Sequence, residues 1–201
     1  MRAVIIGNGT ICDHSYIRSL IHTDDIIICA DGGLKHAAKM GITPDIAIGD
    51  FDSSEKDGSV MTYVYPKRKD FTDGELAVDH AIEQGYDEIL LLGMTGTRID
   101  HTLTNIFLLT KPANIYMADD HNEIYLVRSE LIIKGKKGKT LSIIPVSGDL
   151  KGIETEGLEY PLHGETLFFG HSRGNSNVIT SDLCRISVQS GMGIVLINNG
   201  E

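Results

Sequence analysis

The chain is short of cysteine, of positive charge and of long apolar runs, and each shortage excludes a class of protein. Its three cysteines are scattered among 201 residues with no C-x-x-C pair, which argues against a disulfide framework and a cysteine zinc site. The formal net charge of -10 argues against nucleic acid and anionic membranes as partners. Cys29 lies within an apolar run, so we expect it to be buried as a small apolar residue.

The N-terminal region has no apolar stretch long enough for a signal peptide or a membrane span, because Gly7, Asn8 and Gly9 interrupt it. We therefore expect a cytoplasmic protein. A Walker A loop is also lacking, since no G-x-x-x-x-G-K-[ST] segment occurs. With 41% hydrophobic residues, the chain can bury a substantial core, in one domain or two small ones.

The first half alternates short apolar runs with helical patterns, which is typical of a parallel sheet with helices around it. The apolar runs are Ala3–Ile6, Ile26–Ala30, Ile46–Ile48, Tyr63–Tyr65, Glu88–Leu92 and Asn114–Met117. Helices are predicted over 33–40, 72–84 and 100–109. The second of these begins with Thr72-Asp73-Gly74-Glu75, which matches a capping box.

After about Glu123 the helical patterns stop and short β-type runs appear, separated by glycine turns. These runs are Ile124–Val127, Leu131–Lys134, Thr140–Ile144, Gly152–Thr155, Thr166–Phe169, Asn177–Thr180, Arg185–Val188 and Gly193–Ile197. Strands at this spacing favour a small sandwich or barrel. We predict an α/β domain with a mostly parallel sheet over 1–123, followed by an all-β sandwich-like domain over 124–201.

Acidic residues recur after the apolar runs of the first half, where the carboxyl ends of parallel strands form a ligand crevice. Asp50 and Asp52 follow Ile46–Ile48 and project to one side of an extended segment. Two such carboxylates repel unless a cation lies between them, and Mg²⁺ prefers hard oxygen ligands. The alternative for this pair is a polar turn after a strand.

Two further polar residues lie near the start of the second predicted helix. Asp73 is a candidate metal ligand, although a first-turn aspartate is also favoured by the helix dipole alone. Lys69 is a candidate phosphate contact, and the alternative is that it belongs to a solvated basic loop.

The segment Gly93–His101 joins a strand to a helix, and its glycines allow the backbone to approach an anion closely. Arg98 is a candidate bidentate phosphate ligand and Asp100 a candidate metal ligand, or the two form an ion pair. We expect His101, which shares a helix face with Asn105, to orient another site residue rather than to act as the catalytic base.

Asp31-Gly32-Gly33 is weaker evidence of the same kind, because a turn after an apolar strand can bring backbone close to a nucleotide. In the second half, Ser176 and Asn177 follow a glycine turn. By their residue types alone they are turn residues, although their hydroxyl and amide groups could position an uncharged substrate.

Taken in order, these motifs resemble those of the thiamine pyrophosphokinase (thiamine diphosphokinase) family. The matching segments are Asp31–Gly33, Gly49–Ser53, Lys69–Asp73 with Glu75, Gly93–Asn105, Ser176-Asn177 and Ser190-Gly191. The resemblance spans nearly the whole chain. It implies an ATP-binding α/β domain, a thiamine-binding β domain and a homodimer with thiamine between subunits. The implied reaction transfers a pyrophosphoryl group from ATP to thiamine, giving thiamine diphosphate and AMP.

The resemblance also assigns roles to individual residues. The implied ligands of Mg²⁺ and catalytic carboxylates are Asp50, Asp52, Asp73 and Asp100. The implied nucleotide contacts are Asp31, Gly32, Gly33, Lys69, Thr95, Gly96, Arg98, His101 and Asn105, with Arg98 on phosphate. The implied thiamine contacts are Ser176, Asn177 and Ser190. Val178 stands where bacterial members often have an acidic residue, and which aromatic residue would stack on thiamine stays open among Tyr160, Phe168 and Phe169.

Three other functions fit the same residues. One is a pyrophosphokinase for another hydroxyalkyl heterocycle, such as a pterin. Another is a non-catalytic sensor that binds nucleotide or thiamine without turnover. The last is a metal-dependent nucleotide hydrolase that releases AMP without any acceptor.

Overall fold

A computed structural model describes residues 1–49, 60–64 and 70–200. The chain divides into two compact units, Met1–Asp120 and His121–Glu201, where the sequence led us to expect a boundary after residue 123. The predictions for Asp50, Asp52 and Lys69 lie outside the described residues. Within the described residues, no helix combines the length and apolar character that crossing a membrane requires.

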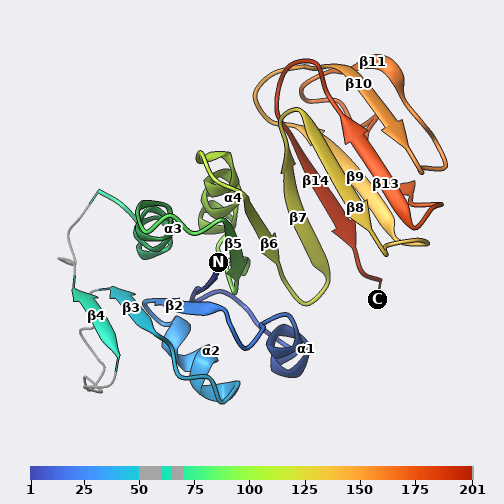
Figure 1. Cartoon of the computed structure of the whole chain (residues 1–201). Helices are drawn as coiled ribbons and strands as arrows, with labels where there is room; N and C mark the ends of the chain where they lie inside the picture. The colour runs from blue at the N-terminus through green and yellow to red at the C-terminus, as the bar shows by residue number, and fades with distance from the viewer. Residues whose placement is uncertain (50–59, 65–69, 201) are drawn as a thin grey trace. The chain divides into compact units, whose positions relative to one another are not determined.

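The first unit is built on a sheet whose neighbouring strands pair in parallel (Figure 1). Its strands are β1 (Arg2–Ile6), β2 (Ile26–Ala30), β3 (Ile46–Gly49), β4 (Met61–Val64), β5 (Glu88–Leu92) and β6 (Ile115–Ala118). Their order is β6-β5-β1-β2-β3-β4, so β1 lies inside the sheet between β5 and β2. The loops after β1, β2 and β5 therefore leave the same edge of the sheet.

These strands form because their side chains are buried on both faces. Four of the five residues in β1, β2 and β5 are fully buried, which explains the unbroken apolar runs in the sequence. Helices α1 (His14–Ser19) and α2 (Gly33–Lys39) pack on one face, where Ile17 and Ala37 join the core of that face. Helix α3 (Asp73–Glu83) lies on the opposite side of the sheet (Figure 1).

The start of α3 agrees with half of the predicted capping box. The Thr72 hydroxyl accepts a hydrogen bond from the Glu75 backbone N–H at 3.1 Å, as an N-cap residue does. The Glu75 carboxylate lies 3.1 Å from Lys111 Nζ, and the same ammonium lies 2.6 Å from Asp79 Oδ1. Lys111 thus ties two turns of α3 to the segment that follows α4.

Two helices differ from the prediction. Helix α1 was not predicted, because its six residues are too few to show a helical period; it begins where the Asp13 carboxylate caps the Ser15 and Tyr16 N–H groups. Helix α4 spans Ile99–Phe107, and a single 3-10 turn, Leu108–Thr110, completes the predicted segment. Helix ends commonly tighten in this way.

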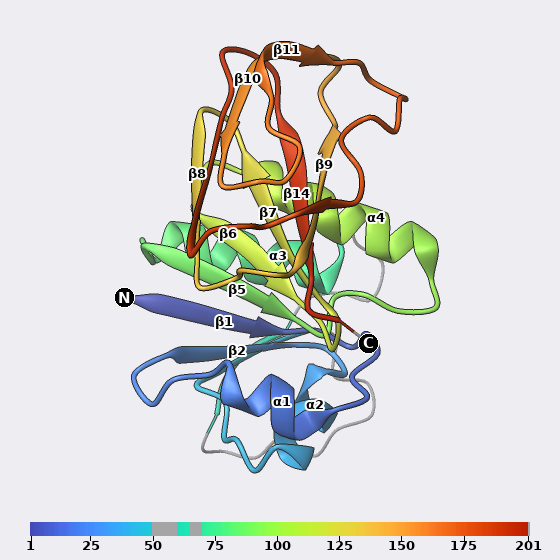
Figure 2. The ribbon, with the colours of Figure 1, turned by 90° about the vertical axis from the view of Figure 1, so that its right-hand side faces the viewer.

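The second unit consists of two antiparallel sheets (Figure 2). One has the order β12-β9-β14-β7 and the other β11-β10-β13-β8. Their strands are β7 (Asn122–Val127), β8 (Glu130–Lys134), β9 (Thr140–Pro145), β10 (Leu150–Glu156), β11 (His163–Leu167), β12 (Asn177–Val178), β13 (Leu183–Ser187) and β14 (Gly193–Asn198). Both sheets supply one core, to which Leu141, Val195, Ile153 and Ile186 contribute.

The predicted α/β part with helices around its sheet and the antiparallel β part after it are confirmed at this level. Cys29 is buried, as predicted. The strand predicted at Thr166–Phe169 is shifted to His163–Leu167, and its pairing with β10 includes a bulge that the sequence pattern does not reveal. As a result Phe168 and Phe169 lie beyond the strand and are exposed.

Candidate nucleotide-binding site

A pocket of about 530 Å³ lies at the carboxyl edge of the first unit's sheet. Its walls come from the loops after β1, β2 and β5 and from the first turns of α3 and α4. It is lined by Gly7, Asn8, Gly9, Thr10, Ala30, Asp31, Thr72, Asp73, Gly74, Gly93, Met94, Thr95, Gly96, Thr97, Arg98, His101, Thr102 and Asn105. This size suits a small molecule or a nucleotide.

The loop after β1 and the loop after β5 are bonded to each other along one wall of the pocket. Gly9 N donates to Gly93 O at 2.6 Å, and Thr10 N donates to Thr95 O at 2.7 Å. A Cβ on Gly9 would lie 2.2 Å from Thr95 O, so only glycine permits this approach. The two loops therefore form a single backbone-lined surface.

Asp31 occupies the turn between β2 and α2 with a φ of 48°, in the left-handed region that aspartate tolerates better than most residues. Such backbone strain is concentrated at ligand sites. Gly32 and Gly33, both predicted nucleotide contacts, bring α2 close to the end of β1. A Cβ on Gly33 would lie 1.9 Å from Ile6 O, so this glycine positions the helix against the sheet.

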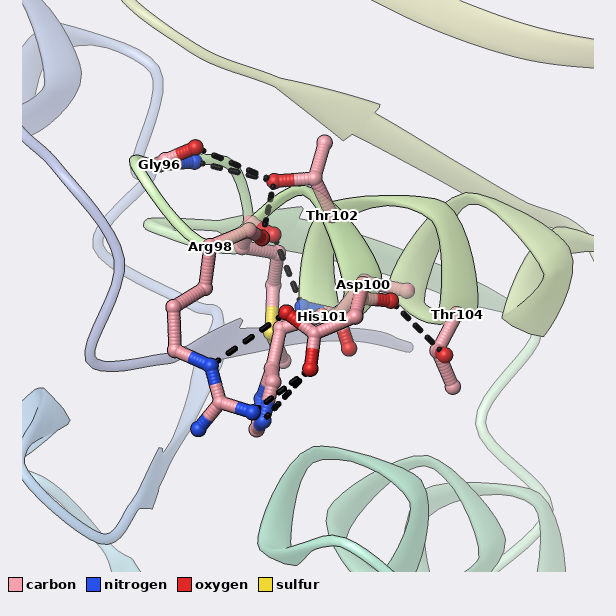
Figure 3. A network of polar contacts seen from close by, with 8 residues as sticks. Gly96, Arg98, Asp100, His101, Thr102 and Thr104 are labelled. Atoms are coloured by element: carbon pink, nitrogen blue, oxygen red, sulfur yellow. Dashed lines mark hydrogen bonds and ion pairs between the residues drawn. The ribbon is translucent and has the colours of Figure 1, made fainter.

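Arg98 and His101 both face the Asp100 carboxylate (Figure 3). Arg98 Nη2 lies 2.5 Å from Asp100 Oδ2, and His101 Nε2 lies 4.0 Å from the same oxygen. Arg98 lowers the pKa of Asp100, and Asp100 raises the pKa of Arg98. Both side chains are well exposed, at 69% for Arg98 and 65% for Asp100, so a ligand can compete for either charge.

Thr102, seen in Figure 3, and Asn105 both bond the loop after β5 from α4. The Thr102 hydroxyl accepts a hydrogen bond from Gly96 N at 3.1 Å. The Asn105 side chain, 9% exposed, donates from Nδ2 to Met94 O at 2.7 Å. The predicted contact Asn105 thus lines the pocket and also holds the backbone that forms its wall.

The pocket brings together most of the residues predicted for the nucleotide and some of those predicted for metal. Asp31, Thr95, Gly96, Arg98, His101, Asn105 and Asp73 line it, and Asp100 lies beside it on Arg98. Within the described residues, the three-residue group whose ligand atoms lie close enough to share an ion is His22, Asp24 and Asp25. Asp25 is bound there to Arg2 at 2.6 Å, which opposes binding of a further cation.

The carboxylates of Asp31 and Asp73, which line the pocket, are oxygen donors of the kind that hard divalent cations prefer. Such ions usually take only one or two protein carboxylates and complete their shell with substrate phosphate and water. The donor set of the pocket therefore fits a divalent ion that arrives with a polyphosphate.

The residues predicted for thiamine lie in the second unit. Ser176 is exposed and has a φ of 59°, and its N–H donates to Ser142 Oγ at 3.0 Å. Asn177 donates from Nδ2 to Tyr160 O at 2.7 Å and accepts from Tyr160 N at 3.1 Å. Ser190 is also exposed and forms a backbone bridge with Lys151.

Sequence reasoning missed the loop Gly7–Thr10, which lines the pocket along its whole length. Its signal was the Gly7-Asn8-Gly9 segment directly after the first apolar run, at the position where phosphate-binding loops occur in parallel sheets. Charged side chains do not mark this loop, because it contributes mainly backbone.

A parallel sheet with a glycine-lined pocket at its carboxyl edge, formed in part by helix N-termini, defines an α/β protein with its ligand pocket where such sheets bind ligands. The comparisons with known proteins specify which one. The family model described as "Thiamin pyrophosphokinase, catalytic domain" matches residues 17–126, and "Thiamin pyrophosphokinase, vitamin B1 binding domain" matches residues 127–194. The chain belongs to the thiamine pyrophosphokinase family, which confirms the resemblance seen in its motifs.

Individual relatives agree with this assignment. A thiamine pyrophosphokinase of Bacillus subtilis (strain 168) is 32% identical over 190 residues, which cover 87% of this chain and 89% of that protein. The crystal structure of thiamine pyrophosphokinase from Bacillus subtilis matches with a TM-score of 0.89 and 27% identity over 100% of both chains. That of thiamin pyrophosphokinase from Geobacillus thermodenitrificans has a TM-score of 0.89 and 26% identity, covering 100% of this chain and 99% of that one.

Proposed function

We infer that this chain is an ATP-dependent thiamine diphosphokinase, which transfers a pyrophosphoryl group from ATP to thiamine. The observation that carries this conclusion is the match of both family models, in order, to residues 17–126 and 127–194. The function predicted from the motifs is confirmed by the same match. The pocket of the first unit supplies a place for the nucleotide.

ATP is proposed to occupy this pocket. Its phosphates would lie against the backbone of the loops after β1 and β5, with Arg98 neutralising their charge. The proposed nucleotide contacts that line the pocket are Asp31, Thr95, Gly96, Arg98, His101 and Asn105, to which the structure leads us to add Gly7–Thr10. Gly32 and Gly33 stay proposed contacts but do not line the pocket, and the proposed contact Lys69 lies outside the described residues.

In the proposed reaction the thiamine hydroxyl attacks the β-phosphorus of ATP and AMP leaves from the opposite side. Most of the catalytic effect would come from positioning and charge neutralisation, as in phosphoryl transfer generally. As the new P–O bond forms and the bond between the β-phosphorus and AMP breaks, the hydroxyl proton passes to an aspartate of the site. The contribution of Arg98 is to hold phosphate oxygens in line.

The family's kinase-like reaction needs a divalent metal. We assign this role to Mg²⁺, which would neutralise the polyphosphate. The proposed carboxylates for it are Asp50, Asp52, Asp73 and Asp100, of which one or two would bind the ion directly. Asn substitutions at these four positions should each lower turnover much more than they lower the melting temperature. Near-wild-type turnover in three of the four variants would refute the assignment.

Thiamine is proposed to bind the second unit, through Ser176, Asn177 and Ser190. We also propose a cytoplasmic homodimer in which the thiamine site lies at the subunit interface. An exposed apolar stripe on helix α4 supports the proposal of a dimer. Ile99, Leu103 and Phe107 repeat at every fourth position and are 65%, 51% and 48% exposed. Sedimentation of the purified chain would test the dimer.

The reaction is tested by incubating the chain with Mg²⁺, thiamine and ATP labelled at the β-phosphorus, followed by mass spectrometry at early times. We expect AMP and labelled thiamine diphosphate in equal amounts. ADP with thiamine monophosphate would refute the one-step transfer. A pterin as the preferred acceptor would indicate a pyrophosphokinase for another heterocycle. AMP without any acceptor product would indicate a nucleotide hydrolase, and tight binding without turnover would indicate a sensor.

A further inference from the structure

Two histidines outside the pocket form a hydrogen-bonded chain that ends on its wall. His14 opens α1 and His36 lies in α2, and neither lines the pocket. His14 Nε2 lies 3.1 Å from His36 Nδ1, and His36 Nε2 lies 2.9 Å from the carbonyl oxygen of Gly9. Their ring centroids are 5.3 Å apart.

The acceptor at the end of the chain determines where the protons lie. A carbonyl oxygen can only accept, so His36 must carry its hydrogen on Nε2. In a neutral imidazole the other nitrogen, Nδ1, is then an acceptor, and His14 must donate to it from Nε2. Burial lowers the pKa of His36, and nearby His14 and Lys39 lower it further, against the opposing effects of the Gly9 carbonyl and Asp120. This favours the neutral ring.

The backbone of Gly9 is held on both sides of its Cα. Its N–H donates to Gly93 O at 2.6 Å, and its carbonyl accepts from His36. Farther along the same loop, the Asp120 carboxylate accepts from Cys12 N at 2.8 Å and from Asp13 N at 2.9 Å. His36 is thus the side chain that fixes the pocket-lining part of this loop from behind.

We propose that His36 is a positioning residue for the nucleotide pocket, and that His14 acts through it by fixing the tautomer that donates to Gly9. The loop can form the pocket wall without rearrangement only if it is already in place, and preorganisation of this kind lowers the cost of binding. The identity of the ligand as ATP rests on the proposed function, whereas the hydrogen-bonded chain does not.

The first test compares four variants by their KM for ATP, KM for thiamine and kcat. His36→Leu removes the donor to Gly9 and should raise KM for ATP roughly threefold to tenfold, as the loss of one hydrogen bond does, with KM for thiamine unchanged. His36→Gln keeps an N–H donor near the Nε2 position and should restore the wild-type value. The KM for ATP of His14→Phe should lie between the values of these two variants. His22→Ala, an exposed histidine of the same unit outside the pocket, is the matched control.

The second test needs no turnover, so the two proposals can fail separately. Nitrogen-15 NMR of the wild-type imidazoles should show His36 protonated on Nε2, and AMP titrated by calorimetry should bind His36→Leu more weakly than His36→Gln. If these hold while no thiamine diphosphate forms, the proposed function fails and the positioning role stands. A His36 ring protonated on Nδ1 alone, or equal AMP affinity in both folded variants, would overturn the positioning role.

Discussion

Arg98 and Asp100 neutralise each other beside the pocket, with Nη2 of the arginine 2.5 Å from Oδ2 of the aspartate. Both were predicted as ligand contacts of opposite kind, one for phosphate and one for metal. Because the pair is solvent-exposed, the interaction is weak enough to be exchanged for ATP and its cation.

Removing Arg98 should therefore weaken ATP binding, whereas removing the charge of Asp100 should lower turnover. Arg98→Ala should raise KM for ATP by about tenfold to a hundredfold, since a charge-assisted phosphate contact is lost. Asp100→Asn should lower kcat in Mg²⁺ but strengthen binding of metal-free AMP, because the arginine is released. Kinetics and calorimetry of the two variants, with Asp24→Asn as a control for lost surface charge, would measure this. Weaker metal-free AMP binding in Asp100→Asn would contradict the exchange.

Gly9→Ala should disturb the pocket wall much more than it disturbs the stability of the fold. In Gly9→Ala the new Cβ would lie 2.2 Å from Thr95 O, so the two loops must move apart. We expect at least about a tenfold loss in kcat/KM for ATP, since misplaced binding groups are costly.

The control for this variant is Gly85→Ala. Gly85 has a φ of 75°, and a Cβ added there would meet nothing within 4 Å, so alanine costs about 1 kcal/mol of backbone strain without touching the pocket. If Gly9→Ala and Gly85→Ala have similar melting temperatures but only Gly9→Ala loses kcat/KM for ATP, the loop after β1 is part of the ATP site. Equal kcat/KM in both variants would show that the β1 loop adjusts freely.

The Arg2–Asp25 pair predicts how stability depends on pH. The Asp25 side chain is 3% exposed. Burial opposes its charge, but the hydrogen bonds from Arg2 and His22 N lower the pKa of Asp25 below its ordinary 3.8. A carboxylate with a lowered pKa stabilises the fold above its unfolded pKa and loses this contribution as pH falls through the folded value.

Asp25→Asn should therefore cost about 3 kcal/mol near neutral pH, because Arg2 stays buried without its partner. The loss should shrink below about pH 4, where the wild-type carboxylate also becomes protonated. Urea unfolding of both proteins between pH 3 and pH 7 would measure it. A constant difference over this range would mean that the pair contributes through packing alone.

Ser176 and Asn177 should behave differently although they are neighbours. The Asn177 amide is already bonded to both backbone groups of Tyr160, so Asn177→Ala should lower the stability of the second unit by about 1 to 3 kcal/mol. Ser176→Ala should leave the melting temperature near wild type and raise KM for thiamine. An equal rise of KM for ATP and for thiamine in Ser176→Ala would show that this residue maintains the fold rather than the acceptor site.

The strands of the first unit could be predicted because burial on both faces leaves unbroken apolar runs, as in Ile26–Ala30. The pocket loops could be predicted in part, since polar residues after such runs must meet at one sheet edge. What could not be predicted depends on distant contacts. Nothing in the sequence indicates that Gly9 approaches Thr95, or that Asn177 binds the backbone of Tyr160. The roles of Asp50, Asp52 and Lys69 stay predictions.

The order of synthesis limits when the second unit can fold. Its first strand, β7, pairs with its last, β14, from Asn122 opposite Asn198 to Val127 opposite Gly193. Asn199 N also donates to His121 O at 2.7 Å, which joins the two ends of the unit. On the ribosome, β7 has no β14 to pair with until residues 193–198 emerge. A chain truncated before residue 193 would expose the edge of β7 as a site for aggregation.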